Sequence, residues 1–174
     1  MQAGHVALAA TIASFTPEIT GAAGTPEMQA LSVSSLVVAF VSHWLPNMDV
    51  IPIKMGLAKD SFHCTWSHSL IFIAFIFLSL WIPGLLWFPI MKSWAVVSLV
   101  SLILHVIADM PSSVGLPILM PFTKRFTINL WADTGHSGWF AFMSTYQQAW
   151  TWIIEGSMFL IFFIRLYQLQ MWIF

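Results

Sequence analysis

Five long apolar stretches alternate with short polar segments along this sequence. They are residues 3–15, 29–45, 69–90, 93–108 and 150–174. Only 7% of the residues are charged, against about 25% in a typical soluble domain. Because so few charges cannot cover a water-soluble globule, we expect the chain to lie in a bilayer, where helices satisfy the backbone polar groups. We therefore predict an all-α integral membrane protein, a single domain over residues 1–174, with about four to five membrane segments.

The lengths of the stretches indicate which of them can cross a bilayer, since a full span needs about 20 residues and at least about 17. Residues 69–90 and 150–174 meet this length easily, whereas residues 3–15 are short enough for a half-span. Residues 116–122 are apolar but far too short to span, so they either re-enter the membrane or lie on it. Residues 139–150 are predicted to form an interfacial helix.

The basic residues indicate the orientation in the membrane. If all five stretches cross, the N-terminus and residues 46–67 and 110–136 lie on one side. The positive-inside rule places the more basic side in the cytoplasm. That side carries Lys54, Lys59, Lys124 and Arg125, and the other side carries Lys92. This topology requires that residues 3–15 cross.

Charge and cysteine content exclude other classes of protein. The net charge of −1 provides no basic field, so we predict no nucleic-acid partner. The single cysteine, Cys64, excludes an intrachain disulfide framework and a zinc finger built from cysteines. No lysine or arginine precedes Lys54, so the N-terminus lacks the positive region of a signal peptide.

The histidines and three of the aspartates fall together in the predicted topology. Ionisable groups are costly at membrane depth, so their positions indicate function. All nine lie at the same membrane face, although hydrophobicity alone defines the five segments. We therefore predict a polar His/Asp site at one membrane interface. The nine residues are His5, His43, His63, His68, His105, His136, Asp49, Asp109 and Asp133.

His105 and Asp109 are four positions apart in the run Leu-His-Val-Ile-Ala-Asp. On a helix, this spacing places both side chains within about 40° of one face. The pair can bind one metal or two adjacent metals. Alternatively, Asp109 orients His105 as a neighbouring partner, or a simple hydrogen bond between the two pins the end of the helix.

His63 and His68 lie in the sequence His-Cys-Thr-Trp-Ser-His-Ser. Five positions separate two helical side chains by about 140°, so the pair shares a face only in a loop or at a helix start. Ser67 suits the N-cap of the following helix, which places His68 in its first turn at the membrane surface. The pair either contributes to a metal site or lies at the interface without a metal.

Asp49 follows Pro46, which ends the second apolar stretch. A carboxylate there is either part of a functional site or the cap of a turn, and His5 alone indicates little. Taken together, imidazole and carboxylate ligands suit zinc, manganese or iron. Five or six ligands exceed what one four-coordinate zinc needs, so a two-metal site that activates water is the corresponding chemistry.

Two further pairs are less closely tied to this set. Asp133 and His136 have a spacing compatible with one helical face, although Gly135 favours a loop. Glu155 and Arg165 lie ten residues apart in the last stretch, so we do not expect them to pair with each other. We expect Glu155 near an interface or against another helix, and Arg165 extended toward the interface.

Four sequence elements, in order and spacing, resemble the YdjM-like, LexA-regulated family of inner-membrane proteins described as metal-dependent hydrolases. The resemblance covers roughly residues 3–127. The elements are Gly4-His5, then Leu-Pro-Asn-Met-Asp at 45–49, then residues 63–69, and finally His105 through Asp109 with the Pro- and Gly-containing stretch and Lys124-Arg125-Phe126 that follow. Against the family's pattern, Asn47 replaces an aspartate, Cys64 an arginine and Ser67 a threonine.

The resemblance implies a helical membrane protein with a hydrolase-like metal site, distantly similar to zinc-dependent phospholipase C. An amide at Asn47 cannot act as an anionic ligand, and Cys64 removes a fixed positive charge that could hold a phosphate. Both changes leave Asp49, His63 and His68 in place. Catalysis could therefore be altered or lost while metal binding survives. Lys124 and Arg125 either contact an anion or serve as a positive-inside anchor.

Our leading hypothesis is a membrane-bound, metal-dependent phosphoesterase that acts on a lipid or lipid-linked phosphate. Its cofactor is a divalent metal, zinc or manganese, and Asp49 serves as a candidate catalytic base. The predicted ligands are His5, Asp49, His63, His68, His105 and Asp109. The alternatives are a non-catalytic metal-binding membrane protein (structural, sensor or transporter) and a membrane scaffold without metal. Clustering at one interface disfavours a transporter, whose polar groups lie near the membrane centre.

Overall fold

The computed structural model describes residues 2–19, 28–59, 65–110, 115–122, 124–128 and 147–173. Five long helices dominate this part of the chain, and each coincides with one predicted apolar stretch. They are α1 (Gln2–Ser14), α3 (Met28–Trp44), α5 (Leu70–Leu86), α6 (Ile90–Asp109) and α8 (Ala149–Ile173). The described residues contain no β-strand, only an isolated bridge between Leu116 and Phe126. The prediction of an all-α fold is confirmed.

Three helical segments of the described chain are long and apolar enough to cross a membrane, namely Ser34–Lys54, Ile90–Asp109 and Ala149–Gln168. The stretch at 69–90 forms α5, which has 17 residues, ends at Leu86 and is not among these three segments. It therefore reaches only the lower limit for a span instead of exceeding it easily. The backbone N–H groups of Trp87 and Phe88 both bond to the carbonyl of Pro83 and close the helix.

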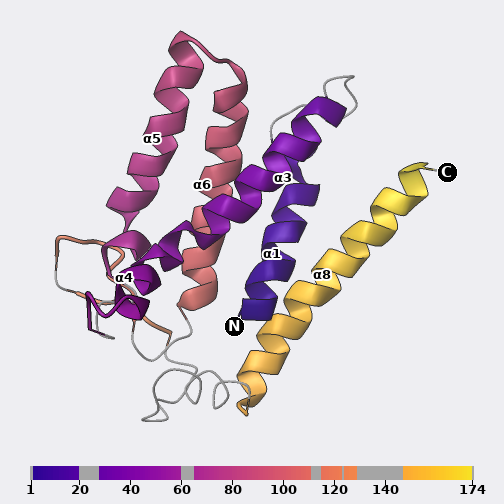
Figure 1. Ribbon diagram of the computed structural model, residues 1–174. Helices are drawn as coiled ribbons and strands as arrows, with labels where there is room; N and C mark the ends of the chain where they lie inside the picture. The colour runs from indigo at the N-terminus through magenta and orange to yellow at the C-terminus, as the bar shows by residue number, and fades with distance from the viewer. Residues whose placement is uncertain are drawn as a thin grey trace.

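The long helices alternate in direction along the chain (Figure 1). In this view α1, α5 and α8 begin at the lower end, whereas α3 and α6 finish there. The helices α5 and α6 form a hairpin, α3 packs against α6 and α1, and α8 packs against α1. Leu102 lies in an apolar cluster between α5 and α6, and Val97 lies in a second one between α1, α3 and α6. The lower end of the bundle therefore collects five helix termini.

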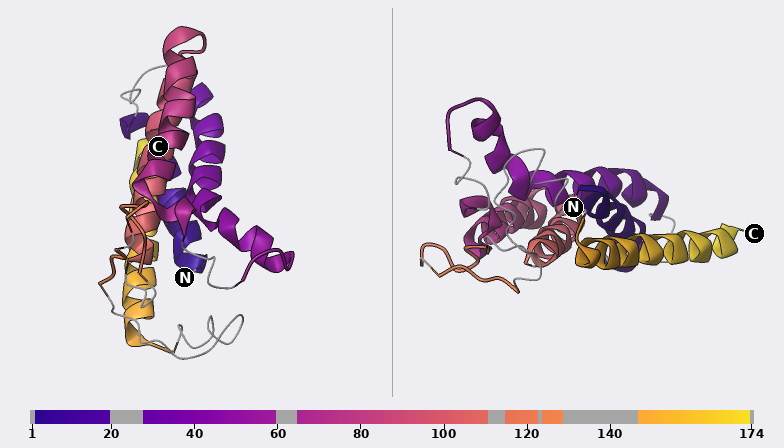
Figure 2. Two further views of the ribbon diagram at one scale, coloured as in Figure 1. Left: turned by 90° about the vertical axis from the view of Figure 1, so that its left-hand side faces the viewer. Right: turned by 90° about the horizontal axis from the view of Figure 1, so that it is seen from below.

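Proline ends α3, as predicted, because Pro46 has no backbone N–H with which to continue the helix. The chain passes through a 3-10 turn, η1 (Leu45–Asp49), into the short helix α4 (Val50–Lys54). Both project from the side of the bundle (Figure 2). The Asp49 side chain nevertheless turns inward, and the residue is 1% exposed.

The N-cap of α5 is Ser69, so the prediction that Ser67 caps this helix is wrong. The Ser69 hydroxyl accepts a hydrogen bond from the Phe72 N–H over 3.2 Å and donates one to the Trp66 carbonyl over 2.6 Å. His68 lies before the helix in a 3-10 turn, η3 (Trp66–His68). Ser67 is therefore available for other contacts, which are described below.

The segment after α6 is fastened to the start of α5. Gly115 has a positive φ of 70°, a conformation that favours glycine, and two backbone hydrogen bonds join Leu116 and Phe126. The N–H of Leu70 donates to the carbonyl of Ile118 over 2.9 Å. Leu116 is buried in the core cluster, while residues 119–122 are exposed. The predicted membrane-associated segment thus has a buried first half and an exposed second half.

Arg165 is buried against neighbouring helix ends, and its extension toward an interface stays a prediction. The residue is 8% exposed and packs against the end of α1 and the short helix α2 (Thr16–Ile19). Its guanidinium donates to the Ser14 carbonyl over 2.9 Å and pairs with Glu18. The guanidinium also lies 4.0 Å from the centre of the Phe15 ring. These contacts offset part of the cost of burying the guanidinium, whose Nε makes no hydrogen bond with the described residues.

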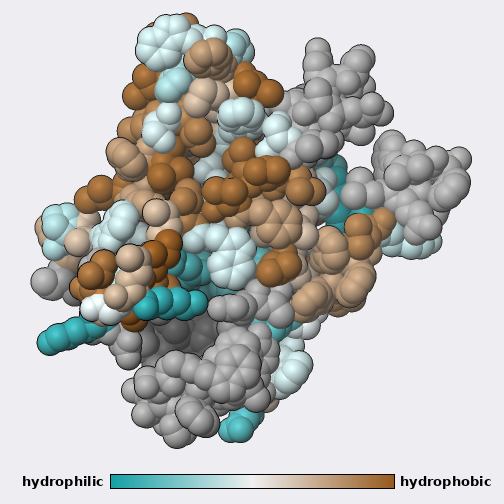
Figure 3. Space-filling model, viewed as in Figure 1, coloured by the Kyte–Doolittle hydropathy of each residue, from teal (hydrophilic) through white to brown (hydrophobic). Residues whose placement is uncertain are grey.

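The outer surface suits a lipid solvent. Large apolar side chains on α5 and α8 are exposed, including Phe75 at 65% and Phe163 at 60%. Figure 3 shows hydrophobic residues over the upper part of the bundle, with hydrophilic residues gathered toward its lower part. On this face, the lower end, where the helix termini meet, is therefore the more polar end of the bundle.

Candidate metal centre

Four histidines and one aspartate meet at the polar end of the bundle. His5 comes from the first turns of α1, His43 from the last turn of α3 and His68 from η3. His105 and Asp109 occupy the last turns of α6. These residues are hereafter the His/Asp cluster. Because each lies at a helix end or in the turn beside it, the alternating directions of the helices bring them together (Figure 1).

His5 bridges the two halves of the cluster. Its Nδ1 lies 2.9 Å from Nε2 of His43, and its Nε2 lies 3.0 Å from Oδ1 of Asp109. The His5 ring centre is 4.6 Å from that of His105. His5, which alone gave the weakest indication of a site in the sequence, thus contacts three other members of the cluster.

The second carboxylate oxygen of Asp109 faces the remaining two histidines. Oδ2 lies 3.1 Å from Nε2 of His105 and 3.4 Å from Nε2 of His68. His105 and Asp109 therefore share one helical face, as their spacing predicts. Both oxygens of a single carboxylate are directed at imidazole nitrogens.

Two sets of three ligand atoms lie within 4.8 Å of one another in the described chain: His5, His43 and His105, and His68, His105 and Asp109. The four histidines are at most 5% exposed. The Asp109 side chain is 21% exposed, so the cluster meets the surface at this carboxylate. His105 belongs to both sets, a geometry that suits one ion or two neighbouring ions.

Hydrogen bonds on the outer side fix the proton on two of the imidazoles. His43 Nδ1 lies 3.1 Å from the Ser101 carbonyl, which can only accept, so Nδ1 carries the hydrogen and Nε2 presents a lone pair. The Ser67 hydroxyl donates to Asp49 Oδ2 over 3.2 Å. It can therefore accept from His68 Nδ1, also at 3.2 Å. The Nε2 atoms of His43 and His68 then face the cluster as lone pairs, as in metal-ligating histidines.

The proton count inside the cluster fits a bound cation. If His5 donates through Nδ1 to His43, its Nε2 and the Asp109 oxygen opposite are both acceptors unless an additional proton lies between them. Neither ring nitrogen of His105 makes a hydrogen bond with the described residues, although Nε2 is close to Asp109. Buried polar atoms of this kind are costly. A divalent metal would satisfy these lone pairs together, so the residues present fit such an ion.

Asp49 lies on the far side of His68 from Asp109. Its Oδ2 accepts hydrogen bonds from Ser67 and from the Thr65 N–H over 3.4 Å, and it lies 3.7 Å from His68 Nδ1. Asp49 belongs to neither set of three ligand atoms. The geometry places this carboxylate where it orients His68, whereas the sequence predicted a ligand and base.

The structure thus brings together four of the six predicted ligands, His5, His68, His105 and Asp109, and places Asp49 beside them. His63 lies outside the described residues, as do Cys64, Asp133 and His136. The sequence interpretation placed His43 at the same membrane face but did not name it as a ligand, and it considered Ser67 only as a helix cap. The signal for His43 was its place at the end of an apolar stretch, on the same predicted face as the other histidines.

These observations define a class of protein, a helical membrane protein with a buried His/Asp cluster at one end of its bundle. The sequence model described as YdjM inner membrane protein matches residues 1–173. The chain therefore belongs to this family of inner membrane proteins, and the resemblance first noted over residues 3–127 extends along nearly the whole chain. No curated protein and no solved structure matches it.

Proposed function

We propose that the protein is a multi-pass inner-membrane hydrolase that uses a divalent metal, zinc or manganese, to cleave a phosphoester of a lipid or lipid-linked phosphate. One observation carries the proposal. Five potential ligands from four separate elements converge at hydrogen-bond distances, and their buried nitrogens face one another and a single carboxylate. Structural packing alone does not require four histidines to meet in this way.

The proposed ligands are His5, His43, His68, His105 and Asp109, with His63 as a predicted further member. A divalent cation held by such groups supplies Lewis-acid activation of water for attack at phosphorus. His43 and His68 contribute lone pairs whose direction is set by the Ser101 carbonyl and by Ser67. Asp49 accepts the hydrogen bond of the Ser67 hydroxyl. The Ser67 oxygen is then an acceptor for Nδ1–H of His68, and this sets the tautomer of His68.

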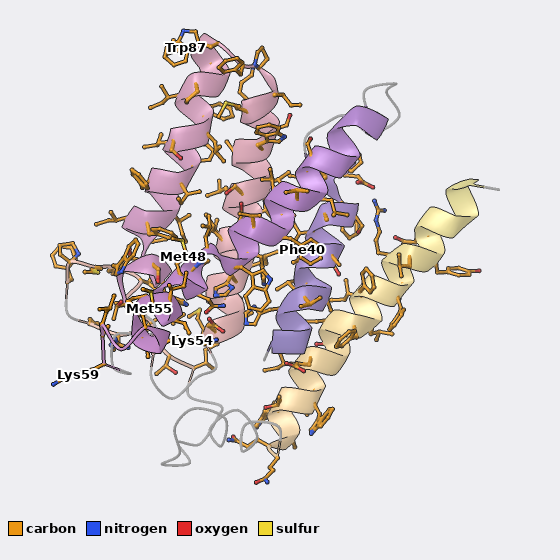
Figure 4. All side chains as sticks on the ribbon, viewed as in Figure 1. Phe40, Met48, Lys54, Met55, Lys59 and Trp87 are labelled. Carbon is orange, nitrogen blue, oxygen red and sulfur yellow. The ribbon has the colours of Figure 1, made fainter. Side chains whose placement is uncertain are left out.

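The position of the cluster supports the proposed substrate class. The helix termini that carry it are at the polar end of an otherwise apolar bundle, where lipid headgroups would lie. Lys54 and Lys59 lie at the same end (Figure 4). We infer that all five long helices span or enter the membrane, and that the cluster and these lysines face the cytoplasm.

One departure from the family's pattern falls outside the cluster. Asn47 lines a shallow groove of about 470 Å³ on the outer side of α3 and η1, together with Phe40 and Trp44. An amide at this position therefore removes no charge from the His/Asp cluster. The position of Asn47 outside the cluster supports a functional metal centre, although the family's aspartate is replaced at this position.

Metal analysis of the purified full-length protein tests the metal site. Wild type prepared without chelators should contain stoichiometric zinc or manganese, and His105→Ala and Asp109→Ala should lose it. Absence of metal from the wild type would contradict the site. Turnover of phosphomonoester and phosphodiester lipids by the loaded protein, lost in both variants, then tests the reaction.

A second candidate function is a non-catalytic metal site that stabilises the bundle or senses metal. The burial of the four histidines favours this reading, because structural metal sites are closed whereas catalytic sites keep a position open to substrate. Metal that is bound stoichiometrically without turnover of any lipid phosphate would support this candidate over the hydrolase.

A further inference from the structure

A stripe of buried polar and charged side chains runs along α8, an otherwise apolar helix. Thr151 is 0% exposed, Glu155 4% and Arg165 8%, whereas Trp152 and Phe163 are about 60% exposed. Charged groups in a membrane segment are costly unless they meet partners. The stripe faces α1, the helix that packs against α8.

The upper end of the stripe binds the C-terminal end of α1. The Arg165 guanidinium donates to the carbonyl of Ser14, the last residue of α1, over 2.9 Å. The last carbonyls of a helix lack partners within the helix and carry the negative end of its dipole. A cation at this point therefore stabilises α1.

The lower end of the stripe packs on the first turn of α1. A Cβ atom at Gly4 would lie 2.8 Å from Cγ of Glu155, 3.2 Å from its Cδ and 3.0 Å from Sδ of Met158. Only a residue without a side chain permits this approach. The carboxylate of Glu155 thus lies beside the N-terminal end of α1, where unpaired N–H groups and the positive end of the dipole favour an anion.

The two contacts are in register. Gly4 and Ser14 are ten residues apart on α1, and Glu155 and Arg165 are ten residues apart on α8. The helices run in the same direction (Figure 1), so both spacings correspond to about 15 Å of rise. The first and last turns of α1 contain no charged residue of their own. The helix α8 therefore supplies complementary charges to both ends of α1.

We propose that Glu155 is a positioning residue for the metal centre. By holding α1 at Gly4, it fixes the next residue, His5, against His43 and Asp109. This inference rests on the proposed function, because it treats His5 as a metal ligand. His5 is the residue that α1 contributes to the cluster, and its two nitrogens meet partners at 2.9 and 3.0 Å. A small shift of α1 would therefore break both contacts.

A pair of glycine substitutions tests the contact. Gly4→Ala places a methyl group against Glu155 and displaces α1 from α8. Gly156→Ala is the matched control, because a Cβ at Gly156 meets nothing within 4 Å. In the full-length protein in lipid nanodiscs, zinc affinity is measured by chelator competition, and the geometry of the site is measured by the absorption spectrum of the cobalt-loaded protein.

Gly4→Ala should weaken zinc binding about 10- to 100-fold, the usual effect of disturbing a partner outside the ligand shell, and should alter the cobalt spectrum. Gly156→Ala should match the wild type in both. Wild-type zinc affinity and an unchanged cobalt spectrum in Gly4→Ala would overturn the inference while leaving the metal site intact.

If Gly4→Ala does not fold, two substitutions at Glu155 that add no bulk test whether its contact with Gly4 supports zinc binding. Glu155→Ala removes the contact, and Glu155→Gln keeps its shape without its charge. Zinc binding should weaken most in Glu155→Ala and be partly rescued in Glu155→Gln. Equal, wild-type zinc affinity in both would also overturn the inference. A wild type that binds no zinc or cobalt contradicts the proposed function itself, and the two failures are therefore distinguishable.

Discussion

At the scale of single residues, the backbone and side-chain groups around the His/Asp cluster determine how its histidines are oriented. The Ser101 carbonyl directs the ring of His43, and Asp49 with Ser67 directs that of His68. In both cases the outer partner binds Nδ1 and leaves Nε2 to face inward. The orientation of the cluster is thus set by groups that do not belong to it.

Asp49 and Ser67 should act as one unit. We expect Asp49→Asn and Ser67→Ala each to weaken zinc binding about tenfold. The double variant should be little weaker than either alone, because both changes break one chain of hydrogen bonds to His68. Ser79→Ala is the control, since among the described residues the exposed Ser79 hydroxyl bonds to the nearby Ile76 carbonyl and to no member of the cluster. Additive losses would contradict the coupling.

Removal of metal should destabilise the wild type more than a variant that lacks His105, the residue common to both sets of potential ligands. A ligand at 100 times its dissociation constant stabilises a folded protein by about 2.7 kcal/mol. A chelator should therefore lower the unfolding temperature of the wild type but scarcely that of His105→Leu. Trp94→Phe, which loses a hydrogen bond to Ser34 away from the cluster, should respond as the wild type does. Thermal unfolding in detergent measures all three.

The sequence could predict some site residues because their chemistry is local. His105 and Asp109 share a face through helical spacing alone, and the structure confirms this. His43 stands alone on an apolar helix, so nothing in its neighbourhood reveals its contacts with His5 and Ser101, which are 38 and 58 residues away. Asp49 was interpreted from its position beside Pro46, which does not indicate which side of His68 it occupies.

At the scale of elements, the start of α5 is set by one hydroxyl. Ser69→Ala removes the N-cap, and we expect a loss of about 1 kcal/mol in the free energy of unfolding. Because η3 and the proposed ligand His68 immediately precede this cap, zinc affinity should fall as well. Denaturant titration and chelator competition measure the two effects. Unchanged stability would show that the cap contributes nothing.

Helix positions could be predicted from hydrophobicity, but their ends could not. The stretch at 69–90 was expected to exceed the length of a span easily because its apolar composition continues through Trp87 and Phe88. Backbone hydrogen bonds to the Pro83 carbonyl end the helix earlier. Similarly, the sequence could not indicate the partners of Arg165, because Ser14 and Glu18 lie about 150 residues away.

At the scale of the whole molecule, the alternating helices define two ends with different exposed residues. Lys59 lies at the end that carries the cluster, and Trp87 lies at the opposite end (Figure 4). We expect Trp87→Cys to react with a membrane-impermeant maleimide in intact cells, and Lys59→Cys to react only after lysis. Both variants require a Cys64→Ser background. The reverse pattern of labelling would place the cluster outside the cytoplasm.

The bridge between His5 and Asp109 joins positions 104 residues apart in the sequence. During synthesis the first of these residues enters the membrane long before the last one exists. The cluster cannot be complete until α6 has been made and has returned to the polar end of the bundle. Metal capture would then mark the moment when insertion of these helices is finished, and a chain stalled before Asp109 would lack the carboxylate that joins the two halves of the cluster.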